Sequence, residues 1–166
     1  ATAPANYKDP GKITMYVAQA NADALNKCSL DVDLCRVVAI GAWREGAEPW
    51  AVVNTDEAGM LRAWWAIASD LHLVGFNCLD FDLPVLLRRS LYLGIPAPHI
   101  SLDKYRHPQV TDLMQELSYN GKLRMRGLAF YCKRFGIAVS DTMKGSDIAL
   151  AVAENRWSDV ETHVKA

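Results

Sequence analysis

The segment Leu73–Arg89, with the sequence LVGFNCLDFDLPVLLRR, constrains the fold of this chain more than any other. It predicts a short apolar strand, Leu71–Phe76, followed by a helix over Leu83–Leu93. Apolar runs of this length are typical of strands buried in a parallel sheet. Asn77 and Asp82 then follow the carboxyl end of a strand, where α/β proteins place their ligands.

Asp82 has two interpretations on this segment alone, and the two are evenly supported. Its carboxylate can cap the predicted helix, with Pro84 as a first-turn proline. It can also bind a cation at the end of the strand, with Arg88 and Arg89 on the helix behind it. Both interpretations place the side chain at the same edge of the sheet.

Strands and helices are expected to alternate along the chain, and their order predicts an α/β fold with a mixed sheet. Two strands, Arg36–Trp43 and Trp50–Val53, are expected to form an antiparallel hairpin. A helix beginning near Asp56 carries Trp64 and Trp65, which we expect in the core. The other helices are expected over Lys12–Lys27, Thr111–Leu117, Met125–Phe135, Ser146–Ala153 and from Trp157 to the end.

Length and composition favour one globular domain with a core of its own. The chain has 166 residues without an internal repeat, and no apolar run approaches the roughly 20 residues needed to cross a bilayer. The four cysteines lack zinc-site spacing, and Cys78 and Cys132 are expected to be buried thiols of a cytoplasmic protein. The net charge of −1 gives no overall nucleic-acid signal, but a nuclease that uses metal ions needs only a local basic rim.

The run from Asn77 to Asp82 resembles Asn-x-x-x-Phe-Asp, the second motif of the DEDD superfamily of 3′–5′ exonucleases. The wider run GFNCLDFDLPVLLRR is similar to phage and bacterial exonucleases related to the proofreading domain of family B DNA polymerases. Residues Pro4–Pro10 and Arg36–Gly41 resemble the same subgroup, so the resemblance spans nearly the whole chain. It implies a ribonuclease-H-like α/β fold, with a mixed central sheet flanked by helices, as a single exonuclease-like domain over residues 1–166.

The resemblance implies an enzyme that hydrolyses phosphodiester bonds from single-stranded DNA ends, with RNA as the alternative substrate. It also implies a role in DNA replication or repair, with a DNA polymerase or replication and repair proteins as partners and no membrane partner. In the family, four carboxylates hold two Mg²⁺ or Mn²⁺ ions, which prefer hard oxygen ligands. Two such ions, about 4 Å apart, activate a water and stabilise the leaving oxygen.

Carried over residue by residue, the resemblance assigns Asp82 as a metal ligand and Asn77 and Phe81 as contacts to the substrate nucleotide. His163 stands where the family has a tyrosine, so it is expected to orient or deprotonate the attacking water. Histidine is a competent base near neutral pH. The alternative is a surface or packed histidine without a catalytic role.

Two parts of the family pattern are absent from the 166 residues. The first motif, Asp-x-Glu, is expected just before Ala1 on the first strand, and the last aspartate just after Ala166, at the end of the last helix. Asp31-Val32-Asp33 is no substitute, because the family has a loop at this position. An inactive exonuclease-like module that binds nucleic acid or a partner is therefore the alternative function.

Three further features have a structural and a functional interpretation. Asp112 is expected to start a helix. Lys144 and the two residues after it form a loop whose N–H groups could bind a phosphate. A basic stretch interleaved with apolar residues predicts a solvated helix face or a contact to a phosphate backbone; its cations are Arg124, Arg126, Lys133 and Arg134.

Overall fold

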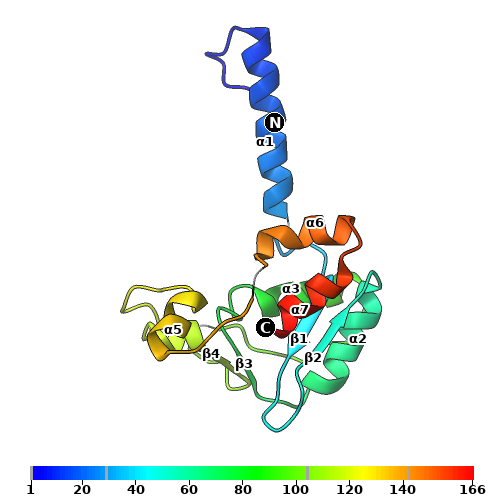
Figure 1. Ribbon diagram of the computed structural model, residues 1–166, viewed down its shortest axis with the longest axis vertical. Helices are drawn as coiled ribbons and strands as arrows, with labels where there is room; N and C mark the ends of the chain where they lie inside the picture. Colours follow the sequence, from blue (N-terminus) through cyan, green and yellow to red (C-terminus); the bar gives the residue numbers. More distant parts are fainter. Residues whose placement is uncertain (1, 29, 104, 142) are drawn as a thin grey trace. The chain divides into compact units, whose positions relative to one another are not determined.

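The computed structural model describes residues 2–28, 30–103, 105–141 and 143–166 (Figure 1). The chain divides into two compact units, Ala1–Arg36 and Val37–Ala166. The expected single exonuclease-like domain over residues 1–166 stays a prediction. No helix in the described part of the chain combines the length and the apolar character that a membrane span requires.

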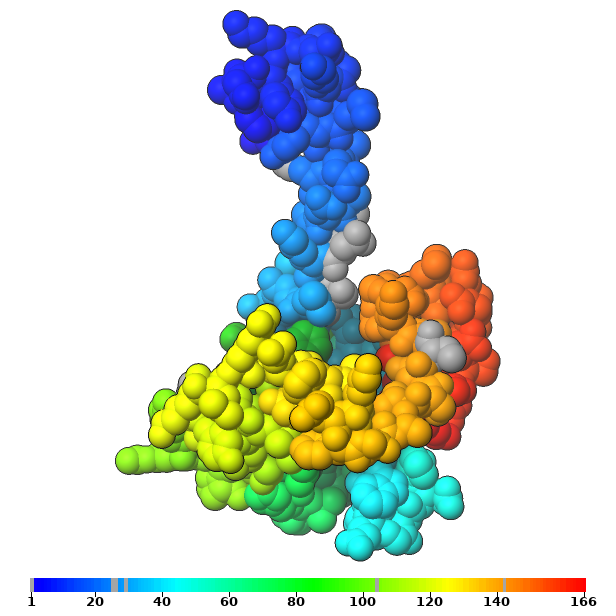
Figure 2. All heavy atoms as spheres, turned by 60° about the vertical axis from the view of Figure 1, so that its left-hand side comes forward, coloured from blue at the N-terminus to red at the C-terminus, as the bar shows by residue number. Residues whose placement is uncertain are grey.

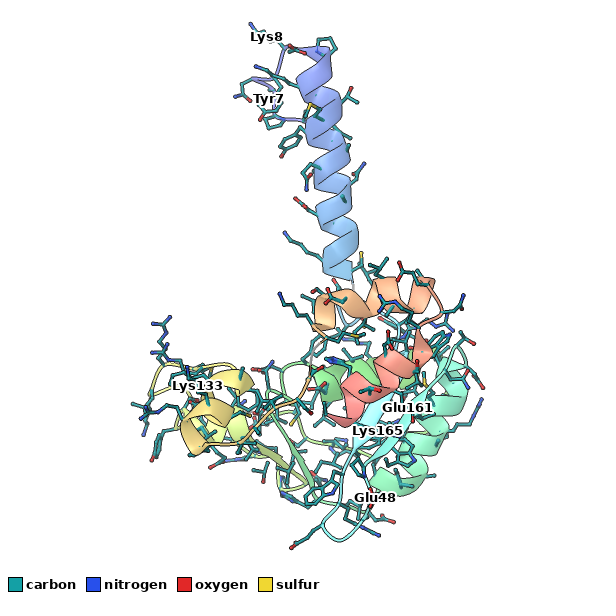
Figure 3. All side chains as sticks on the ribbon, in the orientation of Figure 1. Tyr7, Lys8, Glu48, Lys133, Glu161 and Lys165 are labelled. Carbon is teal, nitrogen blue, oxygen red and sulfur yellow. The ribbon has the colours of Figure 1, made fainter. Side chains whose placement is uncertain are left out.

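The first unit is built around α1 (Pro10–Cys28), which confirms the helix predicted there. Asp9 precedes the helix, and its Oδ1 accepts the N–H groups of Gly11 at 2.7 Å and Lys12 at 3.2 Å. These bonds satisfy donors that the first turn leaves without a helical partner. Tyr7 packs edge-on against the Tyr16 ring, with 5.4 Å between ring centres (Figure 3).

The second unit begins with the predicted antiparallel hairpin, β1 (Ala39–Ala42) and β2 (Trp50–Val53), in which Ile40 lies opposite Val52. The connection includes Gly46 at a φ of 77°, a conformation that glycine adopts without steric cost. The hairpin confirms the sequence prediction, although its first strand is shorter than expected.

Glu57 explains why the first strand begins at Ala39 rather than Arg36. The Val37 N–H donates to Glu57 Oε1 at 2.9 Å instead of to a neighbouring strand. The same carboxylate accepts two bonds of 2.8 Å from Arg89. Glu57 begins α2 (Glu57–Ala68), and Arg89 lies on α3 (Asp82–Tyr92). One buried carboxylate therefore joins Val37, which precedes β1, to both helices.

Helix α2 supplies much of the core. Asp56 caps it by accepting the Gly59 N–H at 2.9 Å, as expected from the sequence. Trp64 and Trp65 are both buried, which confirms their predicted place in the core. The Trp65 indole N–H donates to the Ser90 hydroxyl at 2.8 Å and so ties α2 to α3.

A second, parallel sheet consists of β3 (Leu73–Gly75) and β4 (Val110–Asp112). The prediction of a helix from Thr111 was wrong for its first two residues, because β4 pairs with β3 and α4 (Leu113–Leu117) begins only after it. Val74 is 63% exposed, so the expectation of a fully buried strand was also wrong. In the described residues, two two-stranded sheets stand in place of one mixed central sheet.

Short helices follow the second sheet and largely confirm the predicted ones. They are α5 (Leu128–Phe135), the 3-10 turn η1 (Gly145–Asp147), α6 (Ile148–Ala153) and α7 (Trp157–Lys165). Helix α7 packs against both strands of the hairpin, and Val160 is fully buried (Figure 1). A Cβ at Gly41 would collide with Val164, so α7 can lie this close only because position 41 has no side chain.

Candidate functional site

The loop between β3 and α3 has an uncommon backbone conformation that Asp112 stabilises. Asn77 has a φ of 62°, in the left-handed region that few residues other than glycine adopt. Its N–H donates to Asp112 Oδ1 at 2.9 Å, and the Leu79 N–H donates to Asp112 Oδ2 at 3.0 Å. The loop is therefore held by a carboxylate from the neighbouring strand β4.

Asp112 is almost completely buried, with 1% of the residue exposed. Its Oδ1 also accepts the Met114 N–H at 2.9 Å, which confirms that it starts α4. Three N–H donors compensate a buried charge that would otherwise be costly. Of these roles, only the helix start was predicted from the sequence. Because parallel neighbours end at the same edge of a sheet, recognising β4 would have indicated that Asp112 reaches the loop after β3.

Asp82 is the first residue of α3, and Phe81 occupies the N-cap position. The residue is largely exposed, yet its carboxyl group is partly desolvated. Desolvation raises the pKa of Asp82, the Asp112 charge adds to the rise, and a hydrogen bond to its own backbone opposes it. A nearby cation would favour the charged form of this carboxyl, so the electrostatics are consistent with a ligand position.

Cys78 is close enough to both carboxylates for their charges to act on its thiol. Burial, together with the charges of Asp112 and Asp82, raises the pKa of its thiol to about 12. The thiol therefore stays neutral near pH 7, which confirms the expected buried thiol at this position. The same expectation was wrong for Cys132, which is only half-buried because it lies on α5, a helix without a buried residue.

His163 lies on α7, and Asp141 lies close to it. The two side chains approach to 2.8 Å, measured from Nδ1 to Asp141 Oδ2. The contact does not complete a well-directed hydrogen bond at Nδ1, so we describe it as an electrostatic contact. His163 is the main cause of the lowered pKa of Asp141. Asp141 was not predicted from the sequence, because the 21 intervening positions carry no motif that links the two residues.

The predicted site residues fall into separate groups. Asn77, Phe81 and Asp82 lie together in the loop and first turn that follow β3. Asp112 is the only residue whose charge shifts the Asp82 pKa, and no described bond joins His163 to Asp82. The Lys144 N–H donates to Asp147 Oδ2 at 3.3 Å, which ties Lys144 to its own 3-10 turn. The roles of all these residues stay predictions.

The predicted metal ligand, Asp82, is one of two exposed carboxylates in this loop, together with Asp80. Asp82 is exposed, whereas both oxygens of Asp112 already accept backbone N–H groups. The described part of the chain contains no cluster of three or more His, Cys, Asp or Glu side chains suited to a metal. These residues therefore supply one ligand and do not by themselves complete a site for Mg²⁺ or Mn²⁺.

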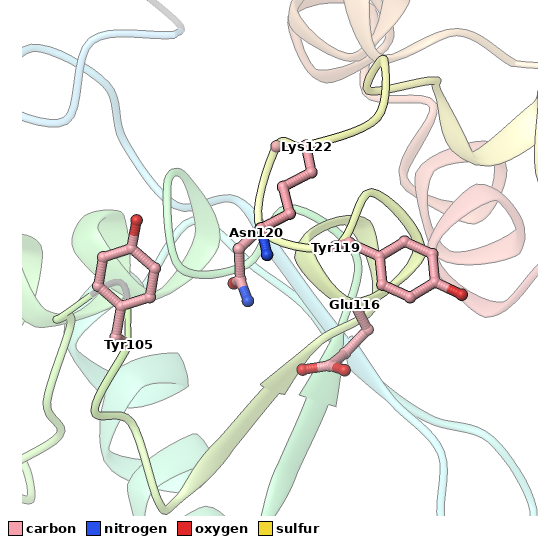
Figure 4. Close-up of a pocket in the computed structure, with 6 residues that line it drawn as sticks. Tyr105, Glu116, Tyr119, Asn120 and Lys122 are labelled. Carbon is pink, nitrogen blue, oxygen red and sulfur yellow. The ribbon is translucent and has the colours of Figure 1, made fainter.

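An open hollow lies elsewhere on the second unit, beside the loop that follows α4 (Figure 4). Its volume is about 440 Å³, and it contains none of the predicted site residues. The hollow is lined by Tyr105, Glu116, Tyr119, Asn120, Gly121 and Lys122.

One protein family matches most of the chain. Its model is described as a predicted 3′–5′ exonuclease related to the exonuclease domain of PolB, and it matches residues 29–166. The matched range contains both sheets and every predicted site residue. No curated protein and no solved structure matches the chain.

Proposed function

Because the chain belongs to the family of predicted 3′–5′ exonucleases related to the exonuclease domain of PolB, we propose that it removes nucleotides from the 3′ ends of single-stranded DNA. The observation that carries the proposal is the loop Asn77–Asp82. Asp112 fixes its backbone, and the loop ends in an exposed carboxylate whose pKa is raised. This arrangement suits a fixed ligand that awaits a cation.

Asp82 is the metal ligand that we assign among the described residues. When bound, two Mg²⁺ or Mn²⁺ ions would stabilise the charge that develops on phosphate oxygens during hydrolysis. Asn77 and Phe81 would contact the terminal nucleotide. Asn77 carries amide donors and acceptors, while Phe81 offers a half-buried ring one residue before Asp82.

His163 is the proposed base. Its Nδ1 faces Asp141, so Nε2 is the ring nitrogen left to accept a proton from water. Asp141 would favour the charged ring that this transfer produces. Lys144 would contact a phosphate of the substrate, since it is an exposed cation within the second unit.

The proposed ribonuclease-H-like fold would unite the two small sheets. An antiparallel pair and a parallel pair within one unit are the components of a mixed sheet, and a strand between β1 and β3 would join them. A polymerase or repair partner and a cytoplasmic location stay predictions from the sequence.

The activity is tested with single-stranded DNA labelled at its 3′ end, incubated with Mg²⁺ or Mn²⁺. The wild-type chain should release mononucleotides, and Asp82→Asn should slow release by more than about 100-fold, since even outer-sphere changes at metal sites cost about 10- to 100-fold. Asp80→Asn is the matched control, because Asp80 is an exposed acid of the same loop. Release by Asp82→Asn at the wild-type rate would remove Asp82 from the site.

A second candidate function is an exonuclease-like module that binds nucleic acid or a partner without cutting it. The observation in its favour is that the described residues contain no cluster of three or more His, Cys, Asp or Glu side chains suited to a metal. Such a module would bind single-stranded oligonucleotides equally well with Mg²⁺ and with EDTA, and it would leave the strands intact.

A further inference from the structure

Positive charge is concentrated in the segment that contains α5. From Leu117 to Ser140 the sequence has no Asp or Glu, whereas it has five cations: Lys122, Arg124, Arg126, Lys133 and Arg134. The whole chain has a net charge of −1, so the other residues carry an excess of negative charge. A local basic region on a nearly neutral chain favours a polyanionic ligand.

These cations are available to a ligand. Every residue from Tyr119 to Ser140 is exposed except Tyr131 and Cys132, which are half-buried. We refer to residues 119–140 as the α5 surface; its yellow to light-orange atoms form a continuous area in Figure 2. None of the five cations forms an ion pair with a carboxylate in the described part of the chain. Lys133 lies on α5 itself (Figure 3).

Aromatic rings lie among the cations. Tyr119 is 66% exposed and Phe135 is 63% exposed. Tyr131 joins the group: its ring centre lies 5.3 Å from that of Phe130 and 6.3 Å from that of Phe135. The Arg126 guanidinium lies 5.1 Å from the centre of the Phe130 ring. Exposed rings next to cations form a platform on which bases stack while phosphates contact the cations.

The aromatic group reaches the candidate site. The Tyr131 ring lies 6.1 Å from the Phe76 ring, and Phe76 directly precedes Asn77 in the loop after β3. A nucleic-acid strand bound to the α5 surface would therefore lie next to the loop that carries Asp82.

We propose that the α5 surface binds single-stranded nucleic acid, with phosphates on its arginines and lysines and bases on its exposed rings. The charge favours a polyanion, and the rings favour a ligand with unpaired bases over a duplex, whose bases are stacked inside. The second part of the proposal, that the surface guides the strand to Asp82, rests on the proposed exonuclease function.

Binding is measured by fluorescence anisotropy of labelled oligothymidine and oligouridine in EDTA, over a series of salt concentrations. Each phosphate contact to a single strand contributes about 0.7 to the slope of log K against log salt. Lys133→Gln/Arg134→Gln should therefore lower the slope by about 1.4, and Arg124→Gln/Arg126→Gln by a similar amount. The matched control is Arg44→Gln/Arg62→Gln, which removes two exposed arginines outside this surface and should leave the slope unchanged.

The rings have their own test. Phe135→Ala should weaken binding of oligothymidine by about fivefold or more, while binding of a duplex should not change. Trp43→Ala is the matched control, since Trp43, in the connection between β1 and β2, is 65% exposed. Circular dichroism melting of each variant checks that the fold is retained.

The outcomes separate this proposal from the proposed activity, because binding in EDTA requires no hydrolysis. Binding that depends on the α5 surface without any cleavage supports this proposal and contradicts the exonuclease function. Cleavage whose rate and substrate affinity are unchanged in all three variants overturns the α5 proposal and leaves the activity. A change of oligomeric state in the variants, seen by sedimentation without a change in binding, also overturns it, because the surface would then be a protein interface. A difference between oligothymidine and oligouridine identifies the preferred strand.

Discussion

The loop Asn77–Asp82 and the α5 surface lie next to each other but are built in opposite ways. Asp112, which is buried, holds the loop through two backbone bonds and caps α4 with a third. On α5 no residue is buried, and every residue except the half-buried Tyr131 and Cys132 is exposed. The first arrangement fixes one carboxylate in a defined place, while the second presents many adaptable groups. The comparison indicates that geometry matters in the loop and that charge and ring area matter on α5.

The largest expected effect comes from removing the acceptor that holds the loop. Asp112→Ala should lower the free energy of unfolding by about 3 kcal/mol or more, because three N–H groups lose a charged acceptor. Urea denaturation followed by circular dichroism measures the change. Met114→Ala, a half-buried neighbour on α4, is the control for general loss of packing. A loss below about 1 kcal/mol would contradict the view of a rigid loop.

The next effect concerns the contact between Asp141 and His163. Asp141→Asn should lower kcat by about 10-fold with little change in KM, because the amide cannot favour the charged ring during proton transfer. Steady-state kinetics on single-stranded DNA measures both constants. Glu48→Gln is the control, as Glu48 is an exposed acid in the connection between β1 and β2. Equal kcat in wild type and Asp141→Asn would show that His163 works without this partner.

A smaller effect follows from the raised pKa of Asp82. Folding favours the protonated form of this carboxyl, so its ionisation costs stability as pH rises through the folded pKa. At pH 7 the free energy of unfolding of Asp82→Asn should therefore exceed that of wild type. We expect a difference of less than about 1 kcal/mol, because the residue is exposed.

Two measurements sharpen this third prediction. The difference between Asp82→Asn and wild type should vanish below pH 3.8, the ordinary pKa of the group. Mg²⁺ or Mn²⁺ should raise the melting temperature of wild type and not that of the variant. A variant less stable than wild type at every pH would contradict a raised pKa of Asp82 in the folded protein.

The smallest effect on stability is expected on α5. Lys133→Gln/Arg134→Gln should change the free energy of unfolding by less than about 0.5 kcal/mol, because both side chains are exposed. Urea denaturation is compared directly with Asp112→Ala. A large loss would mean that these cations hold the fold, which would remove the contrast between the two regions.

The sequence predicted the parts of the fold that depend on local patterns. The hairpin, α2 with its two buried tryptophans and the helix after Asn77 all have clear periodicity and clear ends. Strand β4 was not predicted, because three residues are too few to show the alternating hydrophobicity of a strand. The strand is defined instead by its pairing with β3, in which Leu73 lies opposite Val110. The family was recognised from the Asn77–Asp82 motif, and the family match confirms it.

The candidate site was predicted less completely, and for a related reason. Asp82 and Asn77 belong to one local motif, so a sequence comparison finds them. Asp112 and Asp141 act through bonds to residues far along the chain, at Asn77 and at His163. Neither contact has a sequence signature, because it depends on how strands and helices are packed.

Gly41 shows how the helix that carries His163 could be displaced without a change at any polar residue. Since α7 lies directly over this glycine, even one added methyl group would push Val164 away. The displacement would reach His163, the preceding residue, and leave the Asn77–Asp82 loop intact. A natural variant at position 41 would keep every recognisable motif and still lose the orientation of its base. Inspection of motifs alone would therefore classify such a variant as active.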